Sequence, residues 1–272
     1  MVTFDEIRCA IRELRIEGNP VCLHSSLRSF GAVEGGASAV VDAFLFEECT
    51  LLVPAFSWAY SVSPPVHLQF RRNAADYEYL SRTRTNVDCV FDPETSTEID
   101  EDMGAISVAV VRRAESRRGD HPICSFSAVG PLADQLLKGQ KADDVYAPLD
   151  ALADEGGFVL LAGVDLNKMT LVHLAEKKAG RVLLRRWANG PNGQPLAVEA
   201  GGCSDGFVKL GSALSPFVRE GRVGKSEWGV YPASDALAAA TQAIVDDPYI
   251  THCGNVTCGR CDDLIAGGPI LE

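Results

Sequence analysis

The run FVLLAGVDLNKMTLVHLAE, residues 158–176, decides how the rest of the chain is organised. Its first seven residues are apolar and β-rich, which predicts a buried strand. The next three, Asp165-Leu166-Asn167, predict a tight turn with Asn167 as the N-cap of a helix. On that helix His173 and Glu176 are three residues apart, so their side chains share one face. Ligands of open α/β sheets bind outside the carboxyl ends of strands, so chemistry is expected at this junction.

Strand and helix patterns also alternate on either side of this run. The regular segments we expect are a helix at 4–14, strands at 21–24 and 50–54, an antiparallel pair at 182–187 and 195–198, and a helix at 236–245. Residues 59–102 are polar and irregular, as in a lid, a binding loop or a disordered segment. The pattern predicts an α/β fold with a mixed sheet core flanked by helices.

Composition narrows the class of partner. The chain has 272 residues, is 46% hydrophobic and carries a formal charge of −12. Nucleic acids and anionic membranes are bound through Lys and Arg, so neither is expected as a partner. A cationic ligand fits better, although surface acidity is also common simply for solubility. Because we find neither a signal peptide nor a transmembrane segment, we expect a cytoplasmic protein. Its nine cysteines then indicate free thiols or metal ligands.

A loop rich in Ser and Gly, residues 25–37, lies between a predicted strand and a predicted helix. Backbone N–H groups and the positive dipole end of such a helix bind phosphate, and Arg28 adds a fixed positive charge. The loop matches neither the nucleoside triphosphate nor the dinucleotide pattern. It indicates either another phosphate-bearing ligand or a connection without a ligand.

The segment Gly202-Cys203-Ser204-Asp205-Gly206 satisfies the G-x-S-x-G pattern of α/β-hydrolases. That pattern needs a buried strand that runs directly into the serine, whereas residues 199–202 intervene here. The stretch from Ser204 to His252 is also too short to carry the rest of a catalytic triad. A serine hydrolase is therefore the runner-up interpretation.

The ten residues 252–261, near the end of the sequence, contain one imidazole and three thiols: His252, Cys253, Cys258 and Cys261. Three cysteines with one histidine are a known structural zinc set, although the adjacency of the first two residues strains tetrahedral geometry. A structural zinc and simple free cysteines are both consistent with this pattern.

Several short stretches, taken in order, resemble the aminoglycoside 3-N-acetyltransferase family, also called the antibiotic N-acetyltransferase family. They are residues 24–27, 31–37, 91–93, 103–106, 121–122, 125–126, 163–164, 173–176 and 221–224. The resemblance implies the α/β fold of that family and direct acetyl transfer from acetyl-CoA to an amine. The 3-amino group of a 2-deoxystreptamine aminoglycoside is the first expected acceptor. A different amine, or coenzyme A binding without turnover, remains an alternative.

The resemblance also implies roles for individual residues. His173 is expected to be the general base, with Glu176 or Asp205 as the acid that orients it. The later acidic position of the family is Val208 or Lys209 in this chain. The expected coenzyme A contacts are Ser25, Ser26, Leu27, Arg28, Ser29, Phe30, Gly35, Gly36, Ala37, His121 and Ser125.

The domain organisation follows from the extent of the resemblance, which ends near residue 248. We expect an acetyltransferase domain over residues 1–248 and a Cys-rich tail over residues 249–272. The tail is expected to be a small appendage, stapled by zinc at Cys253, Cys258 and Cys261, or part of a homodimer contact.

Overall fold

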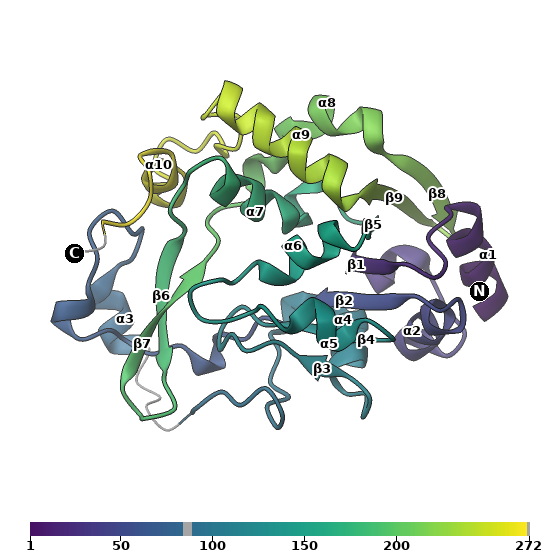
Figure 1. Ribbon diagram of the computed structural model, residues 1–272, viewed down its shortest axis with the longest axis horizontal. Helices are drawn as coiled ribbons and strands as arrows, with labels where there is room; N and C mark the ends of the chain where they lie inside the picture. The colour runs from purple at the N-terminus through teal and green to yellow at the C-terminus, as the bar shows by residue number, and fades with distance from the viewer. Residues whose placement is uncertain (84–88, 271–272) are drawn as a thin grey trace.

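A mixed sheet of seven strands forms the centre of the computed structural model, which describes residues 1–83 and 89–270 (Figure 1). The strand order is β3-β4-β2-β1-β5-β9-β8. β1 is parallel to both β2 and β5, whereas β4 and β9 run antiparallel to their neighbours. The strands are β1 (Pro20–Ser25), β2 (Thr50–Pro54), β3 (Arg117–Arg118), β4 (Phe126–Val129), β5 (Phe158–Ala162), β8 (Arg219–Val223) and β9 (Ser226–Pro232). The predicted α/β class with a mixed sheet is confirmed.

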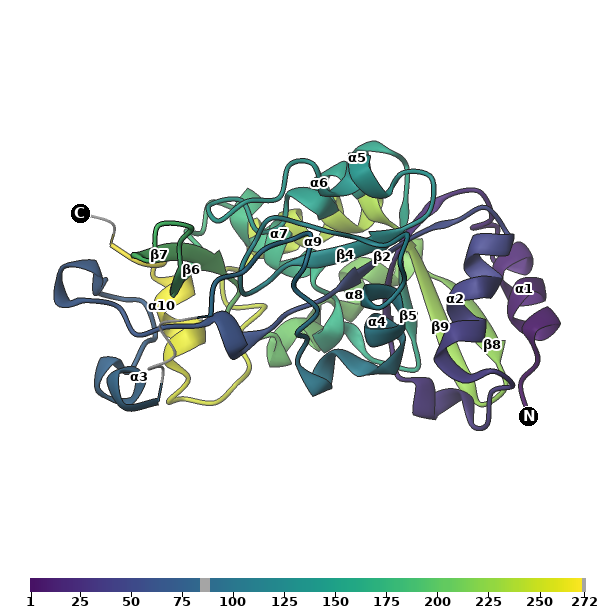
Figure 2. The same ribbon diagram turned by 90° about the horizontal axis from the view of Figure 1, so that it is seen from below.

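Helices cover both faces of this sheet (Figure 2). One apolar cluster lies under α1 (Phe4–Glu13), α2 (Gly36–Phe46) and α4 (Gly104–Val111). The other lies under α5 (Ala133–Leu137), α6 (Ala147–Asp154), α7 (Leu171–Lys178) and α9 (Ala233–Asp246). In β5, Val159 and Leu161 join the second cluster, while Leu160 and Ala162 join the first. Burial on both faces explains why this strand is a continuous apolar run and does not alternate with polar residues.

A smaller unit lies at one end of the molecule (Figure 1). Its hairpin of β6 (Leu184–Asn189) and β7 (Pro195–Ala200) confirms the predicted antiparallel pair. Beside it lie α3 (Tyr77–Thr83) and α10 (Gly259–Ile265); the remaining short helix, α8 (Gly211–Leu214), packs on α9. The buried Trp187 stacks on Phe70 and meets the edge of Tyr77, so part of the segment expected to be irregular is anchored to the hairpin.

The connection from β5 to α7 differs from the prediction. The Asp165 carboxylate accepts the Leu166 N–H at 2.6 Å and caps a short 3-10 turn over Leu166–Lys168. Met169 then leaves helical geometry, and α7 begins at Leu171 with Thr170 at its N-cap. Asn167 is therefore inside the turn, and its prediction as the N-cap of the helix that carries His173 was wrong. No helix in the part of the chain that the structure describes is long and apolar enough to span a bilayer.

Candidate active site

The first turns of α7 carry a hydrogen-bonded pair of buried side chains. His173 Nδ1 lies 2.8 Å from Glu176 Oε2, and the two residues are 9% and 1% exposed. A carboxylate accepts hydrogen bonds, so Nδ1 carries the proton and donates it. Nε2 then holds the lone pair, and no side chain or backbone group within residues 1–83 and 89–270 hydrogen-bonds it. The imidazole is arranged to accept a proton at Nε2.

The second oxygen of Glu176 is also held. Arg181 Nη1 donates to Oε1 at 2.5 Å, and the Thr251 hydroxyl donates to the same oxygen at 3.1 Å. Arg181 is 8% exposed, and its Nη2 donates to the Pro248 carbonyl at 2.5 Å. The carboxylate is therefore fixed from the side opposite His173 by a buried charge pair. Thr251 and Pro248, which hold Glu176 and Arg181 respectively, lie in the segment after α9, far along the chain from α7.

Aromatic rings and a glycine fix the imidazole plane. The Tyr146 ring is nearly parallel to it at 5.8 Å, and the Phe207 ring meets it edge-on at 4.8 Å. A Cβ on Gly201 would lie 2.4 Å from the Tyr146 hydroxyl oxygen and 2.8 Å from His173 Cδ2. Only glycine lets the backbone pass this close to the ring. Burial raises the pKa of Tyr146 well above its usual range, so it remains a neutral phenol.

The Ser/Gly loop of residues 25–37 follows β1 and lies at the carboxyl ends of the parallel strands β1 and β5, where the connection to α7 also begins. The Ser26 N–H donates to the Ala162 carbonyl at the end of β5, and the Ser29 hydroxyl lies 2.8 Å from Ser226 Oγ. Gly163 has a φ of +68°, and a Cβ there would lie 1.9 Å from Ser29 Oγ. The loop and the strand-to-helix connection therefore fit together without room for a further side chain. The parallel strands β1 and β5 bring these two sequence-predicted elements together.

Individual loop residues differ in what they offer to a ligand. Arg28 is exposed, and the N-terminus of α2 at Gly35 has no side-chain cap. Gly36 has a positive φ and open space around its Cα. Phe30, in contrast, is 2% exposed and packs edge-on against Trp228, so its ring belongs to the core. Phe30 can offer a ligand only its backbone.

The structure places His121 and Ser125, both expected as coenzyme A contacts, in the interior. The His121 Nε2 lies 2.9 Å from the Glu199 carbonyl, and its Nδ1 accepts the Cys124 N–H at 2.8 Å. Burial lowers the pKa of His121 to about 4. The Ser125 hydroxyl donates to the Ala55 carbonyl at 3.0 Å. Both residues are fully buried, and these bonds hold the start of β4 in place.

Asp205 is exposed and does not reach His173. Its carboxylate accepts the Cys203 thiol at 3.6 Å, and among the described residues Glu176 is the carboxylate bonded to the imidazole. Ser204 also lacks the geometry of a nucleophile elbow, because β7 ends at Ala200 and a 3-10 turn begins at Asp205. This geometry does not support the serine-hydrolase alternative.

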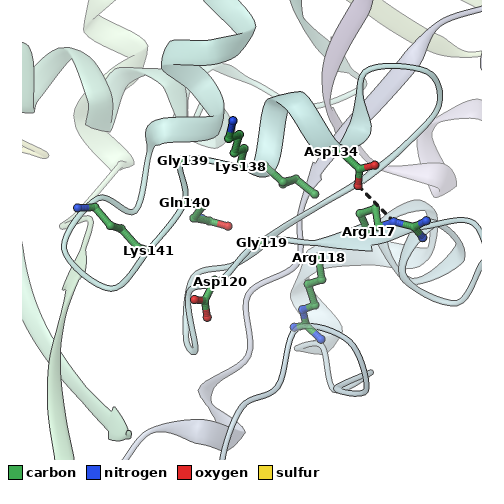
Figure 3. Close-up of a pocket in the computed structure, with 10 residues that line it drawn as sticks. Arg117, Arg118, Gly119, Asp120, Asp134, Lys138, Gly139, Gln140 and Lys141 are labelled. Carbon is green, nitrogen blue, oxygen red and sulfur yellow. Dashed lines mark ion pairs between the residues drawn. The ribbon is translucent and has the colours of Figure 1, made fainter. Parts of the chain in front are cut away.

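Two cavities lie near the sheet, and His173 lines neither. One, of about 600 Å³, borders the turn after β5 and the β8–β9 hairpin, with the carboxylates Asp165 and Glu220 in its wall. The other, of about 420 Å³, lies between β3 and α5 (Figure 3). There Arg117 is paired with Asp134, while Lys138 and Lys141 point away from that pair. The second cavity gathers no set of convergent groups that could do chemistry.

A cluster of four cysteines lies beside the site. The sulfur atoms of Cys203, Cys253, Cys258 and Cys261 are all within 4.8 Å of one another. Sequence reasoning missed Cys203 because it is far from the tail in the chain. His252, which the tail pattern suggested as the fourth ligand, is engaged elsewhere: its ring accepts the Gly254 N–H and pairs with Asp262.

Known proteins share the sequence pattern and the fold of this chain. A family model described as Aminoglycoside 3-N-acetyltransferase matches residues 22–244. Aminoglycoside N(3)-acetyltransferase IX of Micromonospora chalcea is 31% identical over 191 residues, which cover 65% of this chain and 63% of that protein's length. The crystal structure of aminoglycoside acetyltransferase AAC(3)-Xa is similar with a TM-score of 0.73 at 28% identity, over 90% of this chain and 93% of that one. A structure described as AAC-IIIb binary with CoASH shares the fold, with a TM-score of 0.72 at 20% identity over 90% and 96% of the two chains.

Proposed function

Because the chain belongs to the aminoglycoside 3-N-acetyltransferase family, we propose that it transfers the acetyl group of acetyl-CoA to an amino group of a small cationic molecule, with His173 as the general base. The observation that carries this proposal is the buried His173–Glu176 pair, with Nε2 left as the acceptor. The first acceptor to test is the 3-amino group of a 2-deoxystreptamine aminoglycoside, because relatives of similar sequence carry that activity in their names.

His173 acts on the acceptor amine. Its Nε2 accepts a proton from the amine nitrogen as that nitrogen attacks the thioester carbonyl carbon. Glu176 keeps the Nδ1 proton in place and stabilises the imidazolium that forms. When the carbon–sulfur bond breaks, the imidazolium returns the proton to the departing thiolate, so the products are the N-acetyl amide and free thiol. General-base help of this kind contributes about 10²- to 10⁴-fold to the rate.

Direct transfer between two bound substrates fits the site better than an acetylated enzyme. Within the described residues, no Ser or Cys hydrogen-bonds Nε2 of His173, so no protein nucleophile is positioned for activation there. Direct transfer then requires the acetyl donor and the amine to be held together, and their positioning supplies much of the rate.

The Ser/Gly loop is proposed to hold coenzyme A. The phosphates would meet the exposed Arg28 and the uncapped N-terminus of α2, where Gly35 and Gly36 leave the approach open. A protein of the same fold is described as a complex with CoASH, which supports coenzyme A as the ligand. His121 and Ser125 are left out of the proposed donor site because their polar atoms are bonded within the protein.

The acceptor is proposed to be cationic. Asp205 is an exposed carboxylate two residues before Phe207, whose ring contacts His173. Val208 or Lys209 stands where the resemblance places an acidic residue, and the Lys209 ammonium donates to the His252 carbonyl at 2.6 Å. The Lys209 ammonium is therefore bonded to the segment after α9. The exposed carboxylate of Asp205 is proposed to attract the cationic amine.

The proposal is tested by following thiol release from acetyl-CoA with a chromogenic thiol reagent, against a panel of aminoglycosides and simpler amines. We expect release that needs both an amine and His173, with product mass raised by one acetyl group. Release that His173→Ala leaves intact would reject the base, and silence with every amine would reject the activity. Isothermal titration with coenzyme A, made on the same samples, separates loss of donor binding from loss of transfer.

A further inference from the structure

The four-cysteine cluster joins two distant parts of the chain. Cys203 lies in the loop after β7, Cys253 lies after α9, and Cys258 and Cys261 form a Cys-x2-Cys pair at the start of α10. All four are free thiols in the structure, and Cys203 and Cys261 are buried. Four sulfurs at about 2.3 Å from one zinc ion stand about 3.8 Å apart in a tetrahedron. The observed limit of 4.8 Å is close enough that small side-chain movements would complete that geometry.

We propose that Cys203, Cys253, Cys258 and Cys261 together bind one structural Zn²⁺ ion through their four thiolates. Thiolates are soft ligands, and a closed tetrahedral set of four is typical of structural zinc. The Cys253 N–H donates to Cys261 Sγ at 3.4 Å, which is the kind of backbone contact that supports a metal-bound thiolate. His252 lies outside this ligand set because both of its ring nitrogens have other partners.

The metal would clamp the segment after α9 onto the loop of residues 201–206. The two already touch closely: a Cβ on Gly202 would lie 2.3 Å from Leu264 Cδ1, and one on Gly206 would lie 2.2 Å from the Thr251 carbonyl oxygen. Thr251 in turn donates to Glu176, and the loop passes over His173 at Gly201. The cysteines are therefore positioning residues, since they act on the site through the loop and through Thr251.

Metal content of the whole protein, purified without a chelator, is the first measurement. Elemental analysis is expected to find about one zinc per chain. Cys203→Ser should lower the zinc content at least about fivefold, while the control variants Cys9→Ser and His252→Asn should retain it. Zinc retained by Cys203→Ser but lost from His252→Asn would overturn the ligand set, and less than about 0.2 zinc per chain in the unaltered protein would overturn the site.

A second measurement does not depend on whether a cysteine variant folds. The native protein is stripped of metal, reloaded with Co²⁺ alone and examined by absorption spectroscopy. Tetrahedral coordination by four thiolates is expected to give intense ligand-field bands together with thiolate-to-cobalt charge transfer. Weak bands of an oxygen-ligated ion, or mass-spectrometric detection of disulfides among these cysteines in freshly purified protein, would overturn the proposal. Both readouts are independent of acetyl transfer, so a failed activity assay does not affect them.

Discussion

Replacing Glu176 by Gln removes one negative charge and keeps the size of the side chain. The residue is 1% exposed and lies between the imidazole on one side and Arg181 and Thr251 on the other. The amide can present its NH₂ group to Nδ1 of His173. The imidazole proton then moves to Nε2, which can no longer accept one from the substrate.

Two magnitudes follow from this geometry. Loss of the correct tautomer and of the charge that stabilises the imidazolium should lower kcat at least about 100-fold. Leaving a buried cation without its partner costs about 3–5 kcal/mol. Because Arg181 keeps the Pro248 carbonyl and Thr251 hydroxyl as acceptors, we expect the lower end of that range. For a chain of this size, about 3 kcal/mol lowers the Tm by roughly 6–12 °C.

Thiol release gives kcat and KM, and circular dichroism gives the Tm. The matched control is Glu115→Gln, which breaks an exposed ion pair with Arg113 and should change neither quantity appreciably. The double variant Glu176→Gln/Arg181→Met removes the unpaired buried charge, so it should regain much of the Tm while kcat stays low. A kcat within about threefold of the unaltered protein, in a folded Glu176→Gln sample, would refute the assigned role of Glu176.

His173→Ala should lower kcat at least about 100-fold with little change in coenzyme A affinity. Near-normal turnover would show that His173 is not the general base. Asp205→Asn should raise KM for a cationic amine and leave the pH midpoint of kcat unchanged, because Asp205 does not contact the imidazole; a shifted midpoint would contradict this. Burial lowers the pKa of His121 from 6.5 to about 4. The contribution of the neutral imidazole to the free energy of unfolding is therefore fully present above about pH 6.5. That stability, up to about 3 kcal/mol, is lost as the pH falls from about 6.5 to about 4. Urea unfolding at several pH values should therefore show a shallower acid loss for His121→Gln, and an identical loss would contradict the buried neutral histidine. Gly163→Ala should lower the free energy of unfolding by about 1–3 kcal/mol, because the added Cβ would clash with Ser29. An unchanged Tm would show that the loop of residues 25–37 can move away without cost.

Local patterns were enough to predict the parts of the fold that depend on neighbours in the chain. The apolar run of β5, the three-residue spacing of His173 and Glu176, and the β6–β7 hairpin were all predicted from residues close in sequence. The start of α7 was misplaced because the Asp165 side chain caps a separate turn first.

Long-range contacts account for what the sequence could not predict. His121 lies in a stretch that resembles the family, but such a stretch does not say whether a ring faces a ligand or a buried carbonyl. The partners of Glu176 include Thr251, and the thiol cluster includes Cys203; each lies tens of residues from the group it meets. Such pairings are fixed only when the sheet and its covering helices bring the segments together.

The contact between Thr251 and Glu176 also sets an order of events during synthesis. A ribosome makes the chain from the N-terminus, so the imidazole and its carboxylate emerge with α7 well before Thr251 is added. Until the segment after α9 arrives, Glu176 has only Arg181 on this side, and it lacks the Thr251 hydroxyl just as Arg181 lacks the Pro248 carbonyl. The proposed acetyl transfer should therefore reach its full rate only after the segment after α9 has folded back onto α7.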